Sequence, residues 1–358
     1  METTLKDLFE TCKDGYWLNQ IQGNQNILIK DIKGFELCGP GDLTFVPEVS
    51  MLQSVLSRKP SAICCNEKVA KAIEVSNFPD LGVLVSSNTG VSHAKIKQRY
   101  KDRDFSDTGF ELVHPTAIIH ESAQIGQGTR VGPYAVIEQG VSIGQNCVIS
   151  SHVTIEHHVT IGDRTVINPN SVICYSCIVG EDCIILSNSV VGSEGMGYSQ
   201  DEDFNHHRIP QTGIVRLGNR VTIGAANTID RAAYEETVVG DGTIFDNICH
   251  TAHNVQIGKN CILLSGWLCA GSSTLGDRVI ASGQSMLKDH VNVASDTILV
   301  HRAGVIRNIN EKGMYAGSPS QPMKQYTRNL GAYNNLGDLA KQVKELEKKL
   351  AALEESQA

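Results

Sequence analysis

Residues 125–155 read IGQGTRVGPYAVIEQGVSIGQNCVISSHVTI, with isoleucine or valine at every sixth position. The series continues without interruption from Ile119 to Val191. A six-residue period fits neither a helix of 3.6 residues per turn nor a simply alternating strand. It is typical of a hexapeptide β-helix, in which each hexapeptide forms one side of a triangular coil of about 18 residues. We therefore predict a mainly β fold, a left-handed parallel β-helix, for most of the chain.

A second position of the repeat is also restricted. Four residues after each isoleucine or valine comes a small or β-branched residue, as at Ala135, Cys147 and Val153. Such side chains suit a tight corner over the core. Glycine often follows the apolar residue, as at Gly126 and Gly144, and we expect the backbone conformation of the corner to favour it there.

The repeat is interrupted twice. Residues 193–213 are polar and irregular, which predicts a loop that leaves the β-helix. The repeat returns at Leu217, pauses over residues 231–237 and then continues to Val305, which gives roughly nine coils in all. Loops of about 20 residues in a compact domain are usually functional or disordered, and we expect this loop to be functional.

The segments on either side lack the period and predict two further domains. Near the N-terminus, apolar strands at 61–65 and 82–86 alternate with helix-like stretches at 4–12 and 91–100, which indicates a small α/β domain. The predicted domains are therefore residues 1–112, 113–322 and 323–358.

The C-terminal segment carries a heptad pattern. Its apolar residues are spaced alternately by three and four positions: Leu336, Leu339, Val343, Leu346, Leu350 and Leu353. The outer face of this predicted helix is rich in Lys and Glu. A seam this short favours packing on other chains, so we expect an oligomer, and a closed homotrimer suits identical β-helices.

Composition argues against several classes of function. The chain of 358 residues has a formal net charge of −8 and no Lys/Arg tract, so we expect no nucleic-acid partner. Apolar runs stay shorter than a transmembrane helix, so we expect no membrane span. The N-terminal sequence METTLKDLFETCKDG lacks the basic and apolar regions of a signal peptide, and we expect a cytoplasmic location.

The 11 cysteines require neither disulfides nor a metal. Six of them occupy restricted positions of the repeat: Cys147, Cys177, Cys183, Cys249 and Cys261 in the small-residue position, and Cys269 in the apolar position. Buried free cysteine behaves as a small hydrophobic residue. Cys174 and Cys177 form a lone CxxC without a second pair, so we expect neither a metal nor a redox role there.

His253 is the first candidate for chemistry. It lies two positions beyond Thr251, which holds the apolar position, and therefore points away from the core. Asp246 lies seven residues earlier, about one side of the coil away, and a carboxylate there suits the orientation of an imidazole base. On spacing alone, a surface histidine with a structural hydrogen bond is an equally good interpretation.

Gly271 lies 18 residues, about one coil, after His253. Stacking of the coils predicts that its N–H lies near the imidazole, and a bare N–H beside a base suits a tetrahedral oxyanion. Glycine is frequent in these corners, however, so the match is weak by itself. His290, further along the repeat, is a third polar candidate. Trp267 occupies a position otherwise held by small residues, and we expect its indole to shape the groove wall beside His253.

Several motifs together resemble one enzyme family. They are IPQ at 209–211, TIDR at 228–231, FDN at 245–247, AHN at 252–254, GSPSQP at 317–322, HPTAIIHESAQIG at 114–126, GMGY at 195–198 and GDLTF at 41–45. Taken over nearly the whole chain, they resemble the UDP-3-O-acylglucosamine N-acyltransferases of lipid A synthesis. The combination is specific, whereas no single hexapeptide is, because many acyltransferases share the β-helix.

The resemblance implies a homotrimer with active sites in the grooves between adjacent β-helices. It implies transfer of an (R)-3-hydroxyacyl group from acyl carrier protein to the 2-amine of UDP-3-O-acylglucosamine, without a covalent intermediate. His253 would be the general base, Asp246 would orient it, and the N–H of Gly271 would receive the oxyanion. The resemblance implies neither a metal nor a resident cofactor, because the phosphopantetheine of the carrier protein brings the acyl group as a co-substrate.

The resemblance also implies which residues bind the substrate. Within the β-helix these are His290, Gln211, Asn247 and His250. In the N-terminal domain the family binds uracil with an aromatic pair spaced Phe-x-x-Asn-x-x-Tyr, which here reads Phe45, Glu48 and Met51. A methionine can still cover a ring face, whereas a carboxylate does not suit a nearby pyrophosphate, so the nucleotide contact and the sugar stay open.

Docking of the donor requires a local basic patch, because acyl carrier protein is acidic and this chain is acidic overall. The candidates cluster in sequence near the end of the β-helix: Arg302, Arg307, Lys312, Lys324 and Arg328. Ordinary solvated charge is the alternative interpretation of these residues.

Three other functions are compatible with parts of the sequence. The related O-acyltransferase of the same pathway lacks a uracil-binding domain of this kind, so residues 1–112 argue against it. A zinc enzyme of the carbonic-anhydrase type would use histidines such as His250, His253 and His290, but it gives Asp246 and the IPQ and TIDR motifs no role. A non-catalytic scaffold or ligand sensor would keep its function without His253.

Overall fold

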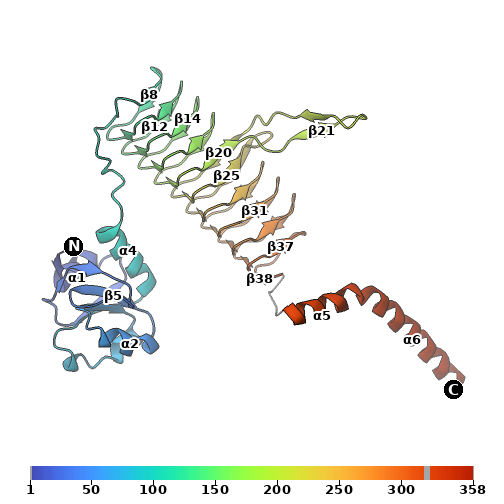
Figure 1. Cartoon of the computed structure of the whole chain (residues 1–358), viewed down its shortest axis with the longest axis horizontal. Coiled ribbons are helices and arrows are strands. Elements are labelled where there is room, and N and C mark those ends of the chain that lie inside the picture. The colour runs from blue at the N-terminus through green and yellow to red at the C-terminus, as the bar shows by residue number, and fades with distance from the viewer. Residues whose placement is uncertain (1, 318–322, 358) are drawn as a thin grey trace. The chain divides into compact units, whose positions relative to one another are not determined.

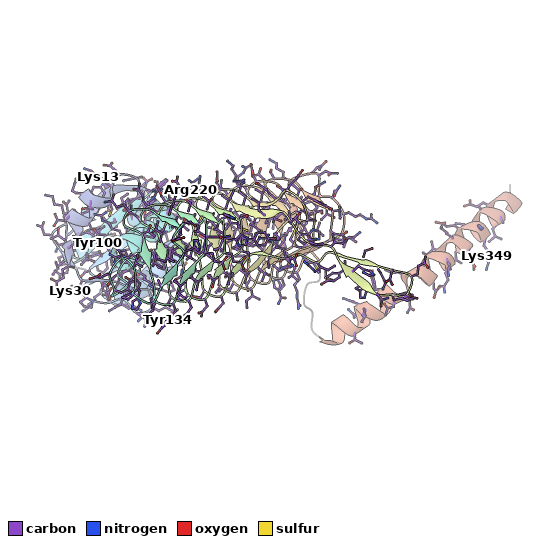
Figure 2. All side chains as sticks on the ribbon, turned by 90° about the horizontal axis from the view of Figure 1, so that it is seen from above. Lys13, Lys30, Tyr100, Tyr134, Arg220 and Lys349 are labelled. Carbon is purple, nitrogen blue, oxygen red and sulfur yellow. The ribbon has the colours of Figure 1, made fainter. Side chains whose placement is uncertain are left out.

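The computed structural model describes residues 2–317 and 323–357, without the side chains of 323–326 and 355–357. The GSPSQP motif therefore lies outside the described residues from position 318 onward. The chain divides into two compact units, Met1–Asp104 and Phe105–Ala358 (Figure 1, with side chains in Figure 2).

The N-terminal unit is a sheet with helices on both faces. Its strand order is β2-β7-β6-β5-β4, and all neighbours are parallel except β2 and β7. The sheet strands are β2 (Leu18–Gly23), β4 (Asp31–Ile32), β5 (Asp42–Val46), β6 (Ala62–Cys65) and β7 (Gly82–Ser86). The other elements are β1 (Thr3–Thr4), α1 (Leu5–Cys12), β3 (Leu28–Ile29), α2 (Val49–Ser57), α3 (Glu67–Lys71), the 3-10 helix η1 (Val75–Asn77) and α4 (Thr89–Lys101). The two strands and two helices predicted in this part of the sequence are confirmed.

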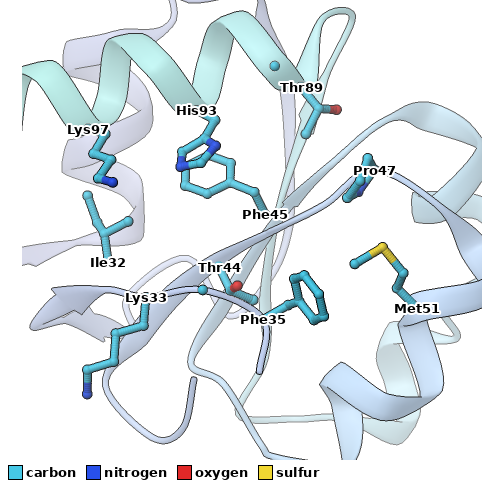
Figure 3. A pocket seen from close by; sticks show the side chains of 12 residues that line it. Ile32, Lys33, Phe35, Thr44, Phe45, Pro47, Met51, Thr89, His93 and Lys97 are labelled. Carbon is cyan, nitrogen blue, oxygen red and sulfur yellow. The ribbon is translucent and has the colours of Figure 1, made fainter. Parts of the chain in front are cut away.

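Alternate residues of the central strands build two cores. On β6, Cys64 belongs to the core that contains Leu8 of α1 and Ile96 of α4. Ile63 belongs to the opposite core, with Val55 of α2. Parallel strands buried on both faces read as continuous apolar runs, which explains the sequence AICC of this strand. A pocket opens between β5, α2 and α4 at the edge of this unit (Figure 3).

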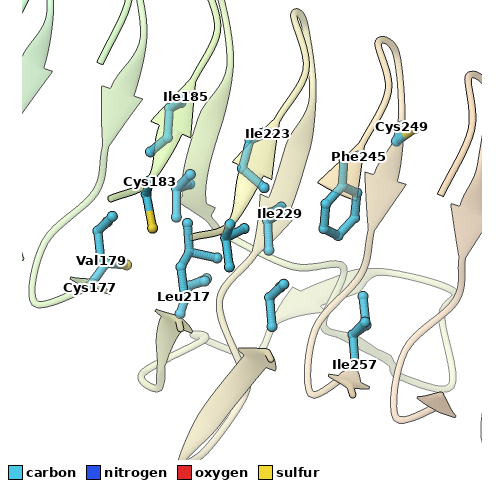
Figure 4. Close-up of a cluster of buried hydrophobic side chains, with 14 of the residues drawn as sticks. Cys177, Val179, Cys183, Ile185, Leu217, Ile223, Ile229, Phe245, Cys249 and Ile257 are labelled. Carbon is cyan, nitrogen blue, oxygen red and sulfur yellow. The ribbon is translucent and has the colours of Figure 1, made fainter. Parts of the chain in front are cut away.

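The second unit contains the predicted β-helix. Its short strands form three parallel sheets, and strands one coil apart pair in register, for example Arg130 with Val148 and Val131 with Ile149. The pairing offset of 18 residues confirms the hexapeptide interpretation. The second residue of most strands points inward and fills the coil, as Val179, Ile223, Phe245 and Ile257 do (Figure 4), whereas the first residue points outward.

The three sheets follow one another around each coil. Sheet 1 comprises β8 (Ile118–Ile119), β11 (Val136–Ile137), β14 (Thr154–Ile155), β17 (Val172–Ile173), β20 (Val190–Ser193), β25 (Thr228–Asp230), β28 (His250–Thr251), β31 (Leu268–Cys269), β34 (Met286–Leu287) and β37 (Gly304–Val305). Sheet 2 comprises β9 (Gln124–Ile125), β12 (Ser142–Ile143), β15 (Thr160–Ile161), β18 (Ile178–Val179), β23 (Ile214–Leu217), β26 (Glu236–Val239), β29 (Gln256–Ile257), β32 (Thr274–Leu275) and β35 (Asn292–Val293). Sheet 3 comprises β10 (Arg130–Val131), β13 (Val148–Ile149), β16 (Val166–Ile167), β19 (Ile184–Ile185), β24 (Thr222–Ile223), β27 (Ile244–Phe245), β30 (Ile262–Leu263), β33 (Ile280–Ala281), β36 (Ile298–Leu299) and β38 (Met314–Tyr315).

Glycine occurs at the corners of the repeat for a different reason from the one expected. Gly126 and Gly144 do not have a positive φ; a Cβ on Gly126 would instead lie 2.4 Å from the backbone of Gly144 in the next coil. The close approach of stacked corners, rather than left-handed backbone, therefore selects glycine there. Left-handed φ occurs two residues later, for example at Asn146 (53°) and Arg164 (57°).

The expected place of Trp267 is wrong. Its side chain is fully buried in the core of the β-helix and does not shape a groove wall. The residues that hold the same position one coil before and one coil after it are Cys249 and Ser285. Their small side chains leave the room that the indole fills.

The cysteines in restricted positions of the repeat are buried and free, as the sequence predicts. Burial raises the pKa of the Cys269 thiol to about 12. It also raises the pKa of Cys174, in the CxxC pair, to about 12. These thiols therefore stay protonated and contribute by packing.

The loop leaves the β-helix and the C-terminal segment is helical, as the sequence predicts, but the loop contains two strands and the segment forms two helices instead of one. In the loop, β21 (Tyr198–Gln200) and β22 (His206–Arg208) pair as an antiparallel hairpin that projects from the coils (Figure 1). The C-terminal helices are α5 (Met323–Asn334) and α6 (Leu336–Gln357), and the six apolar residues of the heptad seam on α6 are exposed in the single chain. Within the described residues, no helix has the length and hydrophobicity needed to cross a membrane.

Candidate active site

One edge of the β-helix carries most of the polar side chains singled out from the sequence. It is the edge where sheet 1 passes into sheet 2, and we call it the site edge. The loop leaves this edge between β20 and β23, and the second interruption leaves it between β25 and β26. His253 and Gly271 follow β28 and β31 on the same edge. Both irregular segments and the candidate base are thus gathered along one line of the fold.

The imidazole of His253 is flanked by two glycines. A Cβ on Gly271 would lie 2.6 Å from Cε1 and 2.7 Å from Nε2 of His253. A Cβ on Gly195, at the start of the loop, would lie 2.8 Å from Cβ and 3.2 Å from Cδ2 of the same histidine. A side chain at either position would displace the ring. The one-coil spacing brings Gly271 to His253, whereas only the path of the loop brings Gly195 there.

The hydrogen bonds of Asn254 fix the tautomer of His253. Nδ1 of His253 lies 3.1 Å from Oδ1 of Asn254. The amide of Asn254 is itself oriented, because Oδ1 accepts the N–H of Ala233 at 2.9 Å and Nδ2 donates to the carbonyl of Tyr234 at 3.0 Å. An acceptor opposite Nδ1 requires a proton on Nδ1, which leaves the lone pair on Nε2. Nε2 is therefore the basic nitrogen, beside Gly271.

The N–H of Gly271 differs from its equivalents in earlier coils. At the same position of the coil, the N–H groups of His157 and Tyr175 donate to the carboxylates of Glu138 and Glu156 at 2.9 and 2.8 Å. The residue that would supply such a carboxylate to Gly271 is Ala252, whose methyl group cannot accept a hydrogen bond. Among the described residues, no acceptor is found for the Gly271 N–H. The alanine of the AHN motif therefore leaves a free donor beside the base.

Asp246 does not orient His253 within one chain, which corrects the expectation from spacing. Asp246 follows β27 at the edge where sheet 3 passes into sheet 1, one side of the coil away from the site edge. Its carboxylate accepts the N–H groups of Asn247 at 2.7 Å and Ser265 at 3.1 Å. Oδ1 of Asn247 in turn accepts the N–H of Ala225 at 2.7 Å. Within the chain, Asp246 and Asn247 thus hold a neighbouring corner together.

Asp230, in the TIDR motif, is a carboxylate near the imidazole that sequence reasoning did not single out. It is 8% exposed, and Oδ1 accepts the hydroxyl of Ser193 at 2.7 Å. Oδ2 lies 3.7 Å from Nε2 of His250, whose Nδ1 lies 2.7 Å from Oγ1 of Thr228. Burial raises the pKa of Asp230, while the Ser193 hydroxyl and the charges of His250 and His253 act in the opposite direction.

Gln211 lies at the foot of the loop. It is buried, and its Nε2 donates to the carbonyl of Ile209 at 3.1 Å. Oε1 is buried without a hydrogen-bond partner among the described residues, so it is left for a ligand or solvent. The backbone N–H of Gln211 approaches Glu194, which forms an ion pair with Arg208 of β22. These contacts tie both ends of the hairpin to the site edge.

His290 lies one coil beyond Gly271 and is exposed. Its backbone N–H donates to the carbonyl of Gly271 at 3.1 Å, and its Nδ1 lies 3.1 Å from Oδ2 of Asp289. The bond from His290 holds the pKa of Asp289 below its ordinary value. The structure thus brings Gly271, Gln211, His250 and His290 to the region of His253 and leaves Asp246 and Asn247 at another edge.

The N-terminal pocket has a volume of about 350 Å³. Phe45 and Met51 line it, as do Phe35 and His93, which sequence reasoning missed. The rings of Phe45 and His93 stack with centroids 4.1 Å apart, and Figure 3 shows Phe35 and Met51 on another side of the pocket. Glu48 is not among the lining residues and instead accepts the hydroxyl of Ser50 at 3.2 Å.

Cationic side chains also reach this pocket. Lys33 and Lys97 line it, and both come from segments beside the aromatic residues. Burial, followed by the charge of Lys97, lowers the pKa of His93. A neutral imidazole stacked on Phe45 presents an aromatic face, while Lys97 offers charge for an anionic group. Nζ of Lys33 lies 3.3 Å from Oδ2 of the buried Asp42, which already balances its charge.

The basic residues at the end of the β-helix are exposed where the structure describes them. Nε of Arg302 donates to Oε1 of Gln284 at 2.9 Å. Arg307, Lys312 and Arg328 are also exposed. The side chain of Lys324 lies outside the described residues.

No group of three or more His, Cys, Asp and Glu side chains suited to a metal ion is found in the part of the chain that the structure describes.

Comparison with known proteins places the chain among acyltransferases. Residues 113–196 match the family model of the GMPPB C-terminal domain. The chain is 45% identical over 354 residues to a UDP-3-O-acylglucosamine N-acyltransferase of Methylococcus capsulatus, covering 99% of each chain. It is 29% identical to the protein of that name from Coxiella burnetii, over 92% of this chain and 94% of that one. The solved structure of an Arabidopsis UDP-N-acetylglucosamine acyltransferase is 26% identical, with a TM-score of 0.52 over 57% of this chain and 71% of that one.

Proposed function

Because the chain belongs to the family of UDP-3-O-acylglucosamine N-acyltransferases, we propose that it transfers an (R)-3-hydroxyacyl group from acyl carrier protein to the 2-amine of UDP-3-O-acylglucosamine. This reaction is a step of lipid A synthesis, and both substrates would be met in the cytoplasm. The observation that carries the proposal is the contact of His253 with Gly271, in a chain that matches such an enzyme over 99% of its length. An oriented imidazole beside a free N–H suits acyl transfer to an amine.

The proposed mechanism uses Nε2 of His253 as the base. This nitrogen takes a proton from the amine as the amine nitrogen bonds to the thioester carbonyl carbon. Negative charge then develops on the carbonyl oxygen, and the N–H of Gly271 stabilises it. The C–S bond breaks, the imidazolium returns its proton to the phosphopantetheine thiolate, and an amide remains. The scheme needs neither a covalent enzyme intermediate nor a resident cofactor.

We assign recognition of the nucleotide to the N-terminal pocket. Phe35, Phe45 and Met51 offer apolar faces for a uracil ring, and Lys97 offers positive charge for the diphosphate. Within the β-helix, His250, Gln211 and His290 are the proposed contacts to the sugar and its acyl group, and the edge that holds Asn247 would reach the substrate from a neighbouring chain.

The outward residues of the three sheets support a homotrimer. Sheet 2 presents mainly polar residues, such as Gln124, Ser142, Thr160, Arg216, Gln256, Thr274 and Asn292. Sheet 3 presents Val148, Val166, Ile184, Ile244, Ile262, Ile280 and Ile298, and sheet 1 presents Leu268 and Met286 beside His250. Two apolar faces and one polar face suit a chain with a neighbour on each of two sides, as in a closed trimer.

The trimer also bears on Asp246. Within one chain its carboxylate is bonded at the edge between sheets 3 and 1, so contact with an imidazole requires a second chain. Light scattering of the full-length protein tests the assembly. A mass of three chains supports the proposal, and a stable monomer at working concentration contradicts it.

The activity is tested with 3-hydroxyacyl carrier protein and UDP-3-O-acylglucosamine, with the amide product read by mass spectrometry. His253→Ala is expected to lower kcat by a factor of about 10²–10⁴, the usual contribution of a general base. Full turnover in this variant would contradict the mechanism and favour a non-catalytic role. An ester product formed on UDP-N-acetylglucosamine would identify the related O-acyltransferase, and stoichiometric zinc lost together with activity on chelation would identify the metal enzyme.

A further inference from the structure

Asp230 occupies a position of the coil at which, in earlier coils, a carboxylate accepts a backbone N–H. We propose that Asp230 is a positioning residue for the acyl transfer. Together with His250, its buried carboxylate stabilises the protonated imidazole that His253 forms when it takes the proton from the amine. This inference rests on the proposed function, because it assigns a role within the same proton transfer.

Equivalent carboxylates in earlier coils are used structurally. Glu138 and Glu156 directly follow strands β11 and β14, as Asp230 ends strand β25. Each glutamate accepts a backbone N–H of the next coil at 2.9 or 2.8 Å. Asp230 is one methylene shorter, and its bonds go to side chains. Its carboxylate is therefore released from the structural role that this position has in earlier coils.

The side-chain partners of Asp230 aim it at the histidines. Ser193, where the loop begins, donates its hydroxyl to Oδ1 at 2.7 Å. Oδ2 faces Nε2 of His250 at 3.7 Å. The register of β25 and β28 stacks Asp230 against Ala252, the residue that precedes His253, and the charge of His253 also acts on the carboxylate. Thr228, two residues before Asp230, bonds the other nitrogen of His250 at 2.7 Å. The carboxylate and both imidazoles thus form one interacting group on the site edge.

The neighbouring arginine does not neutralise this carboxylate. Arg231 is buried and turned into the core, where Nε donates to the carbonyl of Gly192 at 2.8 Å and the guanidinium lies 3.4 Å from the centre of the Tyr175 ring. Among the described residues, no Lys or Arg forms an ion pair with Asp230. A buried carboxylate without a Lys or Arg partner acts strongly on a nearby charge, because little solvent screens it.

The charged groups on the elements around His253 include His250 on β28, Glu194 and Arg208 on the loop, Glu235 on the second interruption, and Lys288, Asp289 and His290 beyond Gly271. His250 faces Asp230 itself. Glu194 is paired with Arg208, and Asp289 with His290. The proton taken from the amine therefore creates a cation near a buried carboxylate of the same chain, that of Asp230. Stabilising that cation strengthens His253 as a base.

The test compares Asp230→Asn with the wild-type enzyme. The NMR signal of the His253 Cε1–H, followed over pH in the full-length protein without substrate, reports protonation independently of turnover. We expect the midpoint to move to lower pH by about 0.5–1 unit in the variant, since a removed anion no longer favours the charged ring. The acid limb of the pH profile of kcat/KM is expected to move in the same direction, with partial recovery in Asp230→Glu.

Glu156→Gln is the matched control, because it removes a carboxylate from the same column of the site edge away from His253. Its midpoint and pH profile are expected to equal those of the wild type. A wild-type midpoint in Asp230→Asn would overturn the inference, whatever the activity. If that variant does not fold, Ser193→Ala removes the bond that favours the ionised carboxylate, and a smaller shift in the same direction is expected; an unmoved midpoint there would equally overturn it. Absence of turnover in the wild type would count against the proposed function alone.

Discussion

Glycine is required at position 271 because the ring of His253 leaves no room for a side chain, and not because the backbone there has a conformation that only glycine adopts. The φ of Gly271 is not positive, yet a Cβ there would lie 2.6 Å from Cε1 and 3.1 Å from Nδ1 of the imidazole. The same glycine leaves an N–H next to the basic nitrogen. A single residue one coil away therefore sets both the room for the proposed base and the place of the proposed oxyanion donor.

The first prediction follows from this contact. Gly271→Ala is expected to push the imidazole out of position and lower kcat by a factor of about 10² or more, comparable with the loss of an oxyanion donor. The melting temperature should change little, because the ring lies at the surface edge. Gly39→Ala is the control, since its nearest contact, 3.9 Å from the Arg58 carbonyl, is ordinary and lies in the N-terminal unit. Equal losses in the two variants would contradict the steric argument.

The second prediction concerns the orientation of the base. Asn254→Asp keeps an acceptor opposite Nδ1 of His253 but adds a negative charge, which favours the protonated ring. The acid limb of the kcat/KM profile is therefore expected to move to higher pH, opposite to the shift expected for Asp230→Asn. Asn254→Ala should instead lower kcat about tenfold without such a shift. A profile that stays in place for Asn254→Asp would show that Nδ1 does not face this side chain in the working enzyme.

The third prediction separates nucleotide binding from chemistry. Phe35→Ala removes one apolar wall of the N-terminal pocket and is expected to raise KM for the UDP-sugar about tenfold, with kcat nearly unchanged, since the ring touches no reacting atom. Glu48→Ala should leave both constants as they are, because Glu48 does not line the pocket. Steady-state kinetics with varied UDP-sugar gives both numbers. An effect of Phe35→Ala confined to kcat would argue against the assignment.

The fourth prediction concerns the carrier protein. Reversal of Arg302 and Arg307 to glutamate is expected to raise KM for the acyl carrier protein several-fold and to weaken its salt dependence, because rim charges act mainly on association. Arg220→Glu, an exposed residue of an earlier coil, is the control for net charge. If both changes raise KM equally, the end of the β-helix is not the docking surface.

The fifth prediction is a stability effect with a definite pH dependence. Burial raises the pKa of Asp230 above the ordinary carboxyl value of 3.8, so the folded state favours the protonated form. The contribution of this group to stability is therefore full below that value and is lost as pH rises through the folded pKa. At pH 7, Asp230→Asn is expected to melt a few degrees higher than the wild type, and the difference should shrink toward pH 4. Calorimetry at both pH values checks this, and a variant that melts lower at pH 7 contradicts it.

The six-residue period of the sequence predicted the features that repeat from coil to coil. Ile or Val every sixth residue determines that strands 18 residues apart pair, and this register alone brings Gly271 to His253. The period does not predict whether a side chain at a corner points into the core or away from it. The sequence therefore predicted Trp267 in a groove wall, whereas its small neighbours leave room for it in the core. It also predicted that Asp246 orients His253, whereas within one chain the two residues lie on different edges of the β-helix.

The sequence by itself thus determined the β-helix, its two interruptions, the flanking elements and the column that holds the base. Only the tertiary structure decided that Asn254 orients His253, that Gly195 packs against the ring, that Asp230 faces His250 and that Phe35 lines the N-terminal pocket. The reason is physical. In a repeat, each coil contacts only the coils next to it, so the period determines those contacts. The other contacts depend on the path of the inserted segments and on which buried polar groups have no other partner.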